Sequence, residues 1–245
     1  MLEGPRALDG ALASGAQVVA VYARPDRVGR RPAGRAGHLY DGPVYEVPAR
    51  ELDDLADAVN PQGVMGVVRT ADAAFDDVAA QPRVVLLDRL RNPGNAGAIA
   101  RSATATGFTG VAASVGTVDL FSPKALRAAA GLSLGSQVCR DLDIAAALEQ
   151  LGAAGHLRVR AAVDGDVDMR ELASQQAAGA AVTLVVGNEA VGPSPETIAG
   201  TDVAVSIPMR APVDSLNVAT AAAVLMYALG DAGPAERAPY PAPDA

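Results

Sequence analysis

The chain has 245 residues, of which 50% are hydrophobic, 20% charged and 3% aromatic; this composition is typical of a globular protein of one or two domains and excludes collagen-like and wholly disordered chains. Its one cysteine, Cys139, excludes an internal disulfide and indicates a reducing, cytoplasmic compartment, and its two separate histidines argue against a metal centre or a Ser-His-Asp triad. The net charge of -8 argues at first sight against a nucleic-acid partner, because phosphate contacts need cations.

Apolar spacing predicts alternating helices and strands in the first part of the chain. In order, they are a helix after Pro5, a strand at 18–23, a weaker strand at 44–47, a helix from Glu51 to Val59 and a strand from Gly63. The acidic, alanine-rich stretch 70–83 shows no clear apolar face. It is interpreted as a linker that ends near Pro82.

After Pro82 the alternation restarts with stronger apolar runs. In order, they are a strand at 84–88, a glycine-rich turn, a helix closed by Gly107, a strand at 110–114, helices at 122–130 and 145–151, strands at 158–163, 182–187 and 203–208, and a long helix at 215–229. Apolar runs without in-out alternation favour a mostly parallel sheet covered on both faces, so the expected fold class is α/β. No run approaches the roughly 20 apolar residues that a membrane span needs, and we expect no membrane partner.

Ligands of such sheets bind at the carboxyl ends of the strands, where three loops have an unusual composition. The first, residues 92–101, combines two Asn, one Pro, two Gly and an Arg at a helix start, where free N–H groups suit an anion. The second, residues 185–193, places Glu189 directly after an apolar strand. Its carboxylate is expected to be either a helix cap or a group that binds a ligand. The third is expected to place Ser215 at the cap of the last helix and Asn217 in its first turn.

In this order and spacing, the three loops resemble the three motifs of the SpoU/TrmH family of RNA ribose 2'-O-methyltransferases, in the SPOUT superfamily. Residues 118–131, V-D-L-F-S-P-K-A-L-R-A-A-A-G, resemble the segment that this family carries between its first two motifs. The N-terminal E-G-P-R-A-L and N-P-Q-G-V-M-G-V-V resemble the L30e-like RNA substrate-binding domain often fused in front. The resemblance implies a substrate-binding domain at 1–78, a catalytic domain at 79–230 and a flexible tail at 231–245.

The resemblance also implies S-adenosylmethionine as methyl donor, a trefoil knot in the C-terminal part of the catalytic domain, and a homodimer with the active site at the subunit interface. The polar positions that match the family's reaction centre are Asn92, Arg101, Glu189, Ser215 and Asn217. The positions that match its donor pocket are Val186, Gly187, Asn188, Gly192, Ile207, Met209, Leu216 and Val218. Glycine's backbone freedom and an apolar floor suit a bent donor wrapped by backbone amides.

Structured RNA is the expected substrate, with rRNA as the first expectation and tRNA as the second. Arg101 is expected to clamp a phosphate and to stabilise the forming alkoxide, because a guanidinium with a pKa above about 12 does not accept a proton. A local surplus of arginines is expected to capture phosphates in spite of the acidic average, unless it is only a solvated loop. These arginines are Arg24, Arg27, Arg30, Arg31 and Arg35.

Two other classes of protein compete with this interpretation. A dinucleotide-dependent oxidoreductase also has a glycine-rich turn after a strand, but the turn here lacks G-x-G-x-x-G, and the strand at 110–114 ends without an acidic residue for a ribose. A catalytically silent RNA-binding protein of the same fold is favoured by the acidic charge. It is disfavoured by the complete set of polar motif residues.

Overall fold

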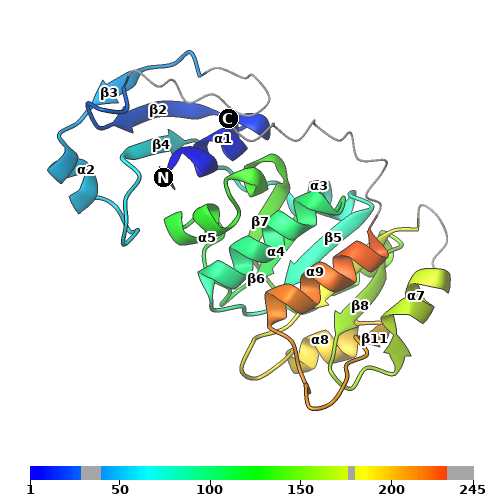
Figure 1. The fold of residues 1–245 in the computed structure, drawn as a ribbon. Helices are drawn as coiled ribbons and strands as arrows, with labels where there is room; N and C mark the ends of the chain where they lie inside the picture. Colours follow the sequence, from blue (N-terminus) through cyan, green and yellow to red (C-terminus); the bar gives the residue numbers. More distant parts are fainter. Residues whose placement is uncertain (29–39, 176–179, 231–245) are drawn as a thin grey trace.

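The N-terminal part of the chain is a four-stranded mixed sheet with a helix packed on it (Figure 1). The computed structural model describes residues 1–28, 40–175 and 180–230. The strands of this part are β1 (Leu2–Glu3), β2 (Val18–Ala23), β3 (Val44–Glu46) and β4 (Val64–Val68), and its helices are α1 (Pro5–Ala13) and α2 (Ala49–Asp54). The strand order is β1-β4-β2-β3, with β2 antiparallel to β4 and parallel to β3. Leu2, Leu8 and Val21 are fully buried in its core.

The second helix of this part is shorter than its sequence predicts. It ends at Asp54, and Val59, the last apolar residue of the predicted helix, is 95% exposed. The backbone N–H of Asp57 donates to the Glu3 carboxylate, so it does not extend the helical hydrogen-bond ladder. Pro61 also restricts the residue before it to extended backbone.

The larger C-terminal part is a seven-stranded sheet in which all described pairings are parallel, in the order β7-β6-β5-β10-β8-β11-β9. Its strands are β5 (Arg83–Leu87), β6 (Gly110–Ser114), β7 (Gln137–Leu142), β8 (Leu157–Ala161), β9 (Val167–Asp168), β10 (Val182–Val186) and β11 (Val203–Ser206). Its helices are α3 (Phe75–Ala79), α4 (Pro93–Ala105), α5 (Pro123–Ala128), α6 (Ile144–Ala153), α7 (Met169–Gln175), α8 (Pro195–Gly200) and α9 (Val218–Leu229), with a 3-10 turn at Leu132–Gly135.

Both faces of the large sheet are covered, as the continuous apolar runs predicted. Side chains alternate along β5: Val85 and Leu87 point into the core under α4 and α9, whereas Val84 and Leu86 point into the core under α3 and α6. Every residue of β5, β6 and β10 is buried. Because both faces are closed, the carboxyl edge of the sheet is where a ligand can enter.

The interpretation of residues 70–83 as a linker is wrong for part of this stretch. Helix α3 lies within it, and its Val78 and Ala79 are buried against the large sheet. A helix of five residues is too short to show an apolar period, which explains the error. The short elements α7, α8 and β9 and the strand β7, whose residues 140–142 are polar or only partly buried, were missed for similar reasons.

The two parts meet where β1 contacts α5 and α1 packs against the 3-10 turn that follows α5 (Figure 1). A Cβ atom on Gly10 would lie 1.8 Å from the carbonyl oxygen of Ala130, and one on Gly131 would lie 2.0 Å from that of Ala7. Gly131 also has a φ of 72°, which glycine adopts without strain. The backbones of the two parts are therefore in direct contact, and Arg127 of α5 adds an ion pair with Glu3 of β1.

Candidate functional site

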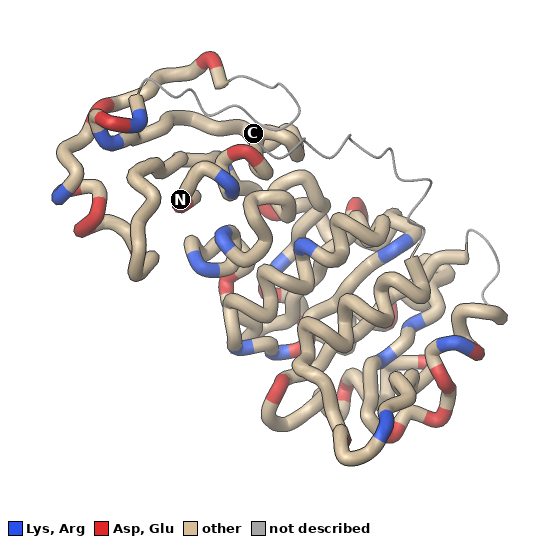
Figure 2. Tube along the Cα trace, viewed as in Figure 1, with Lys and Arg blue, Asp and Glu red and all other residues tan. Residues whose placement is uncertain are grey.

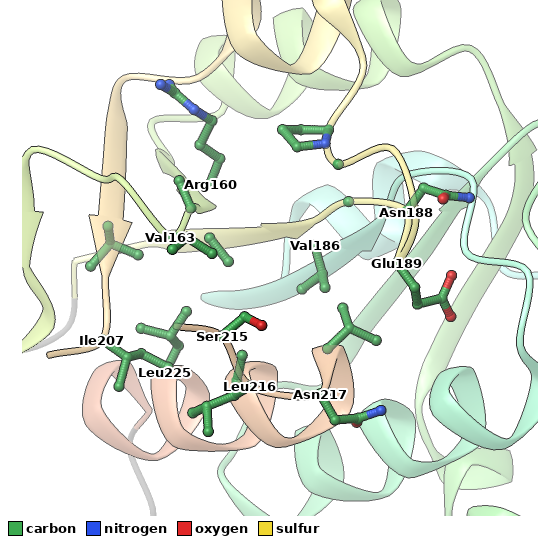
Figure 3. Close-up of a pocket in the computed structure, with 18 of the residues that line it drawn as sticks. Arg160, Val163, Val186, Asn188, Glu189, Ile207, Ser215, Leu216, Asn217 and Leu225 are labelled. Carbon is green, nitrogen blue, oxygen red and sulfur yellow. The ribbon is translucent and has the colours of Figure 1, made fainter. Parts of the chain in front are cut away.

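A cavity of about 790 Å³ opens at the carboxyl ends of β8, β10 and β11 (Figure 3). It is lined by residues 160–164 at and after the end of β8, by the loop after β10 and by the segment that joins β11 to α9. Segments far apart in the sequence meet here because parallel strands end at the same edge of the sheet. The volume lies within the range of about 300 to 1,000 Å³ that is usual for pockets of small ligands and cofactors.

All eight residues predicted to hold the donor line this cavity. They are Val186, Gly187, Asn188, Gly192, Ile207, Met209, Leu216 and Val218. Three residues of the predicted reaction centre, Glu189, Ser215 and Asn217, line it as well. The other two, Asn92 and Arg101, are not among the lining residues.

Glycines shape the loop after β10. Gly192 has a φ of 74°, and its backbone pairs with that of Asn188 through two hydrogen bonds of 3.2 and 2.9 Å. A Cβ atom on Gly187 would lie 2.5 Å from the nitrogen of Pro193, so this loop folds back on itself only with glycine at that position. The Asn188 side chain donates to the carbonyl of Arg89 at 2.7 Å, which ties the loop to the end of β5.

The two ends of the cavity differ in polarity (Figure 3). Val163, Ile207 and Leu225 lie toward one end, above which Arg160 is the charged side chain, whereas Glu189 and Asn217 lie at the other end. An apolar floor beside a glycine loop with accessible backbone fits S-adenosylmethionine, which combines a flat adenine with a polar methionine tail.

A chain of hydrogen bonds connects three polar side chains at the cavity's polar end. Asn217 Nδ2 donates to Asn95 Oδ1 at 3.3 Å, and Asn95 Nδ2 donates to Glu189 Oε1 at 3.0 Å. Glu189 also accepts the backbone N–H groups of Arg91 and Asn92, each at 3.4 Å. Burial alone would raise the pKa of Glu189, but these hydrogen bonds outweigh burial and hold the pKa of its carboxyl below the usual value.

Asn95 is a functional candidate that the sequence analysis missed. It lies in the first predicted loop three residues after Asn92, the asparagine chosen there, and spacing alone does not separate the two. In the structure Asn92 caps α4 by accepting the N–H of Gly94 at 2.8 Å, with Pro93 at the first helical position. Asn95 is the one whose side chain joins Glu189 and Asn217.

The expectation that Ser215 caps the last helix is wrong. Helix α9 begins at Val218, and Asn217 caps it by accepting the N–H groups of Ala219 and Thr220 at 2.9 and 3.4 Å. Ser215 lies two residues before this cap. Its hydroxyl donates to Asp214 at 3.3 Å and lines the cavity.

Arg101 lies away from the other reaction-centre residues of the same chain. Helix α4 begins at Pro93, so Arg101 is in its third turn and not at its start. Six residues separate Arg101 from Asn95, which rotates the two side chains by about 120° around the helix. Arg101 is exposed and lines a second cavity, between the two parts of the chain.

The predicted phosphate-capturing arginines are only partly covered by the structure. Arg24 pairs with Asp53, and Arg27 lies 3.5 Å from Asp26. Arg30, Arg31 and Arg35 lie outside the described residues. The two described arginines therefore already have acidic partners.

Asp88, at the end of β5, is a second residue that the sequence analysis did not single out. Its side chain is fully buried and accepts the N–H of Ser194 at 2.6 Å and the hydroxyl of Thr197 at 2.8 Å. Arg89 Nε donates to its other oxygen at 3.1 Å. A buried carboxylate thus fixes the far end of the loop that walls the cavity, and only its position after an apolar strand could have indicated this.

Within residues 1–28, 40–175 and 180–230, no group of three or more His, Cys, Asp or Glu side chains could hold a metal ion. In the same part of the chain, every helix is too short or too polar to cross a membrane.

The fold and the cavity define an α/β enzyme that binds a small ligand at the carboxyl edge of a parallel sheet and carries a second, smaller domain beside it. A sequence model of the SpoU rRNA Methylase family matches residues 82–227, and a model described as RNA 2'-O ribose methyltransferase substrate binding matches residues 1–73. The chain belongs to the SpoU rRNA methylase family. It is an S-adenosylmethionine-dependent RNA methyltransferase, as its three loops predicted.

Individual relatives agree with this assignment. The Bacillus subtilis protein named 23S rRNA (guanosine(2553)-2'-O)-methyltransferase RlmP is 30% identical over 76% of this chain and 71% of its own. An uncharacterized tRNA/rRNA methyltransferase of Mycolicibacterium vanbaalenii is 34% identical over 75% of this chain and 60% of its own.

Solved structures with bound AdoMet, that is S-adenosylmethionine, share the whole fold. The SpoU methyltransferase AviRb of Streptomyces viridochromogenes superposes with a TM-score of 0.76 at 26% identity, over 93% of this chain and 88% of its own. The rRNA methyltransferase of Sinorhizobium meliloti superposes with a TM-score of 0.74 at 28% identity, over 93% of this chain and 85% of its own. The predicted α/β fold with a mostly parallel sheet is confirmed.

Proposed function

We propose that this protein methylates a ribose 2'-hydroxyl of rRNA and that the cavity at the carboxyl edge of the large sheet holds the methyl donor. The observation that carries the proposal is the convergence of all eight predicted donor residues on one cavity, beside the Asn217–Asn95–Glu189 chain. The name of the B. subtilis relative supports rRNA, whereas tRNA is the second candidate because other relatives are named tRNA/rRNA methyltransferases.

The cavity residues divide into two roles. Val163, Ile207 and Leu225 would contact the adenine, while the backbone of residues 187–192 would hold the ribose and methionine. When bound, the donor supplies a methyl group on a sulfonium, which is already an activated electrophile. The protein's task is therefore to align a ribose hydroxyl with that methyl and to assist the loss of its proton.

The polar chain is suited to orientation and not to proton removal. Because the pKa of Glu189 is lowered, its carboxyl is ionised at neutral pH and is a weak base. It fixes the amide of Asn95, which in turn fixes Asn217 at the mouth of the cavity. Arg101 would clamp a phosphate with two N–H groups and stabilise the negative charge that develops on the ribose oxygen.

We propose that the active unit is a homodimer in which Arg101 serves the cavity of the partner subunit. The separation of Arg101 from the cavity of its own chain supports this arrangement. Apolar side chains at the cavity rim and on α9 are also exposed: Val213 by 52%, Leu216 by 37% and Tyr227 by 77%. A second subunit would cover such residues.

Complementation between two inactive variants tests the shared site. Arg101→Ala and Asn217→Ala are co-expressed, so that mixed dimers contain one site with both residues intact. We expect either variant alone to be inactive and the mixture to recover about a quarter of the wild-type rate, from one site in half of the dimers. No recovery would place both residues in the site of one chain.

The reaction is tested with total RNA and methyl-labelled donor, followed by mapping of the position that resists alkaline cleavage. We expect one labelled ribose in rRNA. Label in tRNA alone would select the second candidate substrate. Failure to bind S-adenosylmethionine in calorimetry would leave a catalytically silent RNA-binding protein.

Three further features are proposals of the same kind. Replacement of Arg27, Arg30 and Arg31 by Ala is expected to weaken RNA binding and to leave donor binding intact. The trefoil knot in the C-terminal part of the catalytic domain stays a prediction from the family resemblance. The domain division at residue 78 stays a prediction, beside matched family ranges of 1–73 and 82–227. The predicted flexible tail at 231–245 lies outside the described residues.

A further inference from the structure

We infer that the cleft between the two parts of the chain is a binding site for the phosphodiester backbone of the substrate RNA, in which Arg6 holds a phosphate next to the one held by Arg101. The inference rests on the proposed function, because RNA is the substrate there. It gives a role to Arg6, which belongs to the N-terminal motif E-G-P-R-A-L but was not among the arginines expected to bind phosphate.

The cleft is built from both parts of the chain. It has a volume of about 300 Å³; Arg6 of α1, Ala56, Ala58 and residues 60–65 line it on one side, and Arg101 of α4 and Arg127 of α5 on the other. Lys and Arg positions lie on both sides of this junction (Figure 2). An RNA segment in the cleft would touch the substrate-binding domain and the catalytic domain together.

Two of the three arginines in the cleft are free to bind an anion. Arg127 is neutralised by Glu3, the one acidic side chain among the described residues that line the cleft, and lies 3.5 Å from Asp57. Arg6 and Arg101 are exposed, and neither forms an ion pair or a side-chain hydrogen bond with any residue that the structure describes. The lining therefore has a positive surplus in a chain whose net charge is -8.

The other polar groups of the cleft match the same ligand. The amide side chains of Asn60 and Gln62 line it and can donate to a phosphate oxygen or pair with a ribose hydroxyl. Arginine forks bind phosphate with two parallel N–H groups. A backbone phosphate flanked by sugars uses both kinds of group.

The walls of the cleft are fixed before RNA binds. Gly10 and Gly131 place the backbones of the two parts in direct contact, and the buried Glu3 holds Arg127 in position. Arg6 lies four residues before Gly10 on α1, one helical turn away. Little free energy is then lost in ordering the site on binding.

Helix α4 carries both Asn95 and Arg101, and in the proposed homodimer Arg101 leads from the cleft to the donor cavity of the partner subunit. Asn95 lies at the cavity and Arg101 at the cleft, about 9 Å further along the helix axis. An RNA strand that follows the cleft therefore leads to Arg101, the residue proposed to act at the reaction centre. This continuity explains why a free arginine on α1 would matter for methylation.

The test compares Arg6→Ala with Arg50→Ala, which removes another exposed arginine without a described partner, on α2 of the same domain and outside the cleft. The probe is a 23S rRNA transcript, bound at several salt concentrations. We expect Arg6→Ala to weaken binding several-fold and to lower the slope of log affinity against log salt by about 1. Arg6→Lys should retain most of the affinity, and Arg50→Ala all of it.

Two further measurements make the outcome decisive. Donor affinity and melting temperature should be unchanged in Arg6→Ala, because Arg6 stabilises no described contact. Equal RNA affinity and equal salt slope in Arg6→Ala and Arg50→Ala would overturn the inference. A wild-type protein that neither binds nor methylates the transcript would instead refute the proposed function, and the inference with it.

Discussion

At the scale of single residues, the buried carboxylate of Asp88 connects the first strand of the catalytic domain to the loop that walls the donor cavity. Its hydrogen bonds reach Ser194 and Thr197, which begin α8. The next residue, Arg89, has a left-handed backbone with a φ of 55°, and its carbonyl accepts from Asn188 of the same loop. Two adjacent residues of β5's carboxyl end therefore hold both ends of the loop.

Asp88→Asn is expected to destabilise the fold and to weaken donor binding together. An asparagine has one acceptor oxygen, and its amide hydrogens would face the N–H of Ser194 or the guanidinium of Arg89, both of which are donors. Loss of a buried charged acceptor costs about 2 to 3 kcal/mol of unfolding free energy. Denaturant unfolding and calorimetry with S-adenosylmethionine measure the two effects.

Asp77→Asn, on the exposed side of α3, is the matched control and should change unfolding by less than about 0.5 kcal/mol. If Asp88→Asn and the wild type had the same denaturant midpoint of unfolding, the hydrogen bonds to Asp88 would contribute no net stability.

At the scale of elements, apolar runs in the sequence were sufficient to predict the type and bounds of an element that is long or fully buried. The strand at 18–23 has the predicted bounds, and the strands β5, β6 and β10 lie within two residues of theirs. Short elements such as α3 were not predictable, since five residues show no period. The residue at which a helix begins also mattered. Because α4 begins at Pro93, Arg101 points away from the cavity, and Asn95 lies where Asn92 was expected.

The segment between the two domains is attached to the edge strand β7 by charge. Arg140 of β7 donates two hydrogen bonds to Asp72, at 2.7 and 2.9 Å, and one to Asp119 at 2.6 Å. Its guanidinium also lies 4.6 Å from the centre of the Phe121 ring. The hydrogen bond from Arg140 holds the pKa of the Asp72 carboxyl below its usual value in spite of partial burial.

This pair predicts how stability changes in acid. A carboxyl whose pKa is lower in the folded state stabilises the protein above its unfolded pKa of about 3.9, and this contribution is lost as the pH falls through the folded value. We expect Asp72→Asn to melt at a lower temperature than the wild type at pH 7 and to lose less stability on acidification. Melting curves between pH 7 and pH 2 test this, and parallel curves for the two proteins would contradict it.

At the scale of the whole molecule, the two domains are joined by backbone contact at α1 as well as by the connecting segment. The donor cavity lies entirely within the larger domain, whereas the arginine cleft needs both domains in place. Donor binding and RNA binding should therefore respond differently to a disturbance of the junction.

Gly10→Ala separates these two activities. In an exposed helix this substitution would stabilise by about 1 kcal/mol. Here the new Cβ would lie 1.8 Å from the carbonyl oxygen of Ala130, so α1 must shift and we expect a net loss of about 1 to 3 kcal/mol. The shift displaces Arg6 from Arg101, so rRNA affinity should fall while donor affinity stays at the wild-type value.

Ala13→Ser, at an exposed position of the same helix, adds one atom without a contact across the junction and should change neither affinity. Calorimetry with S-adenosylmethionine and binding of the 23S rRNA transcript give both values for each variant. If Gly10→Ala weakened donor binding as much as RNA binding, the cavity would depend on the junction. The shape of the donor cavity in the larger domain would then depend on α1, because a shift of α1 would move α5 and, through it, the carboxyl edge of the sheet.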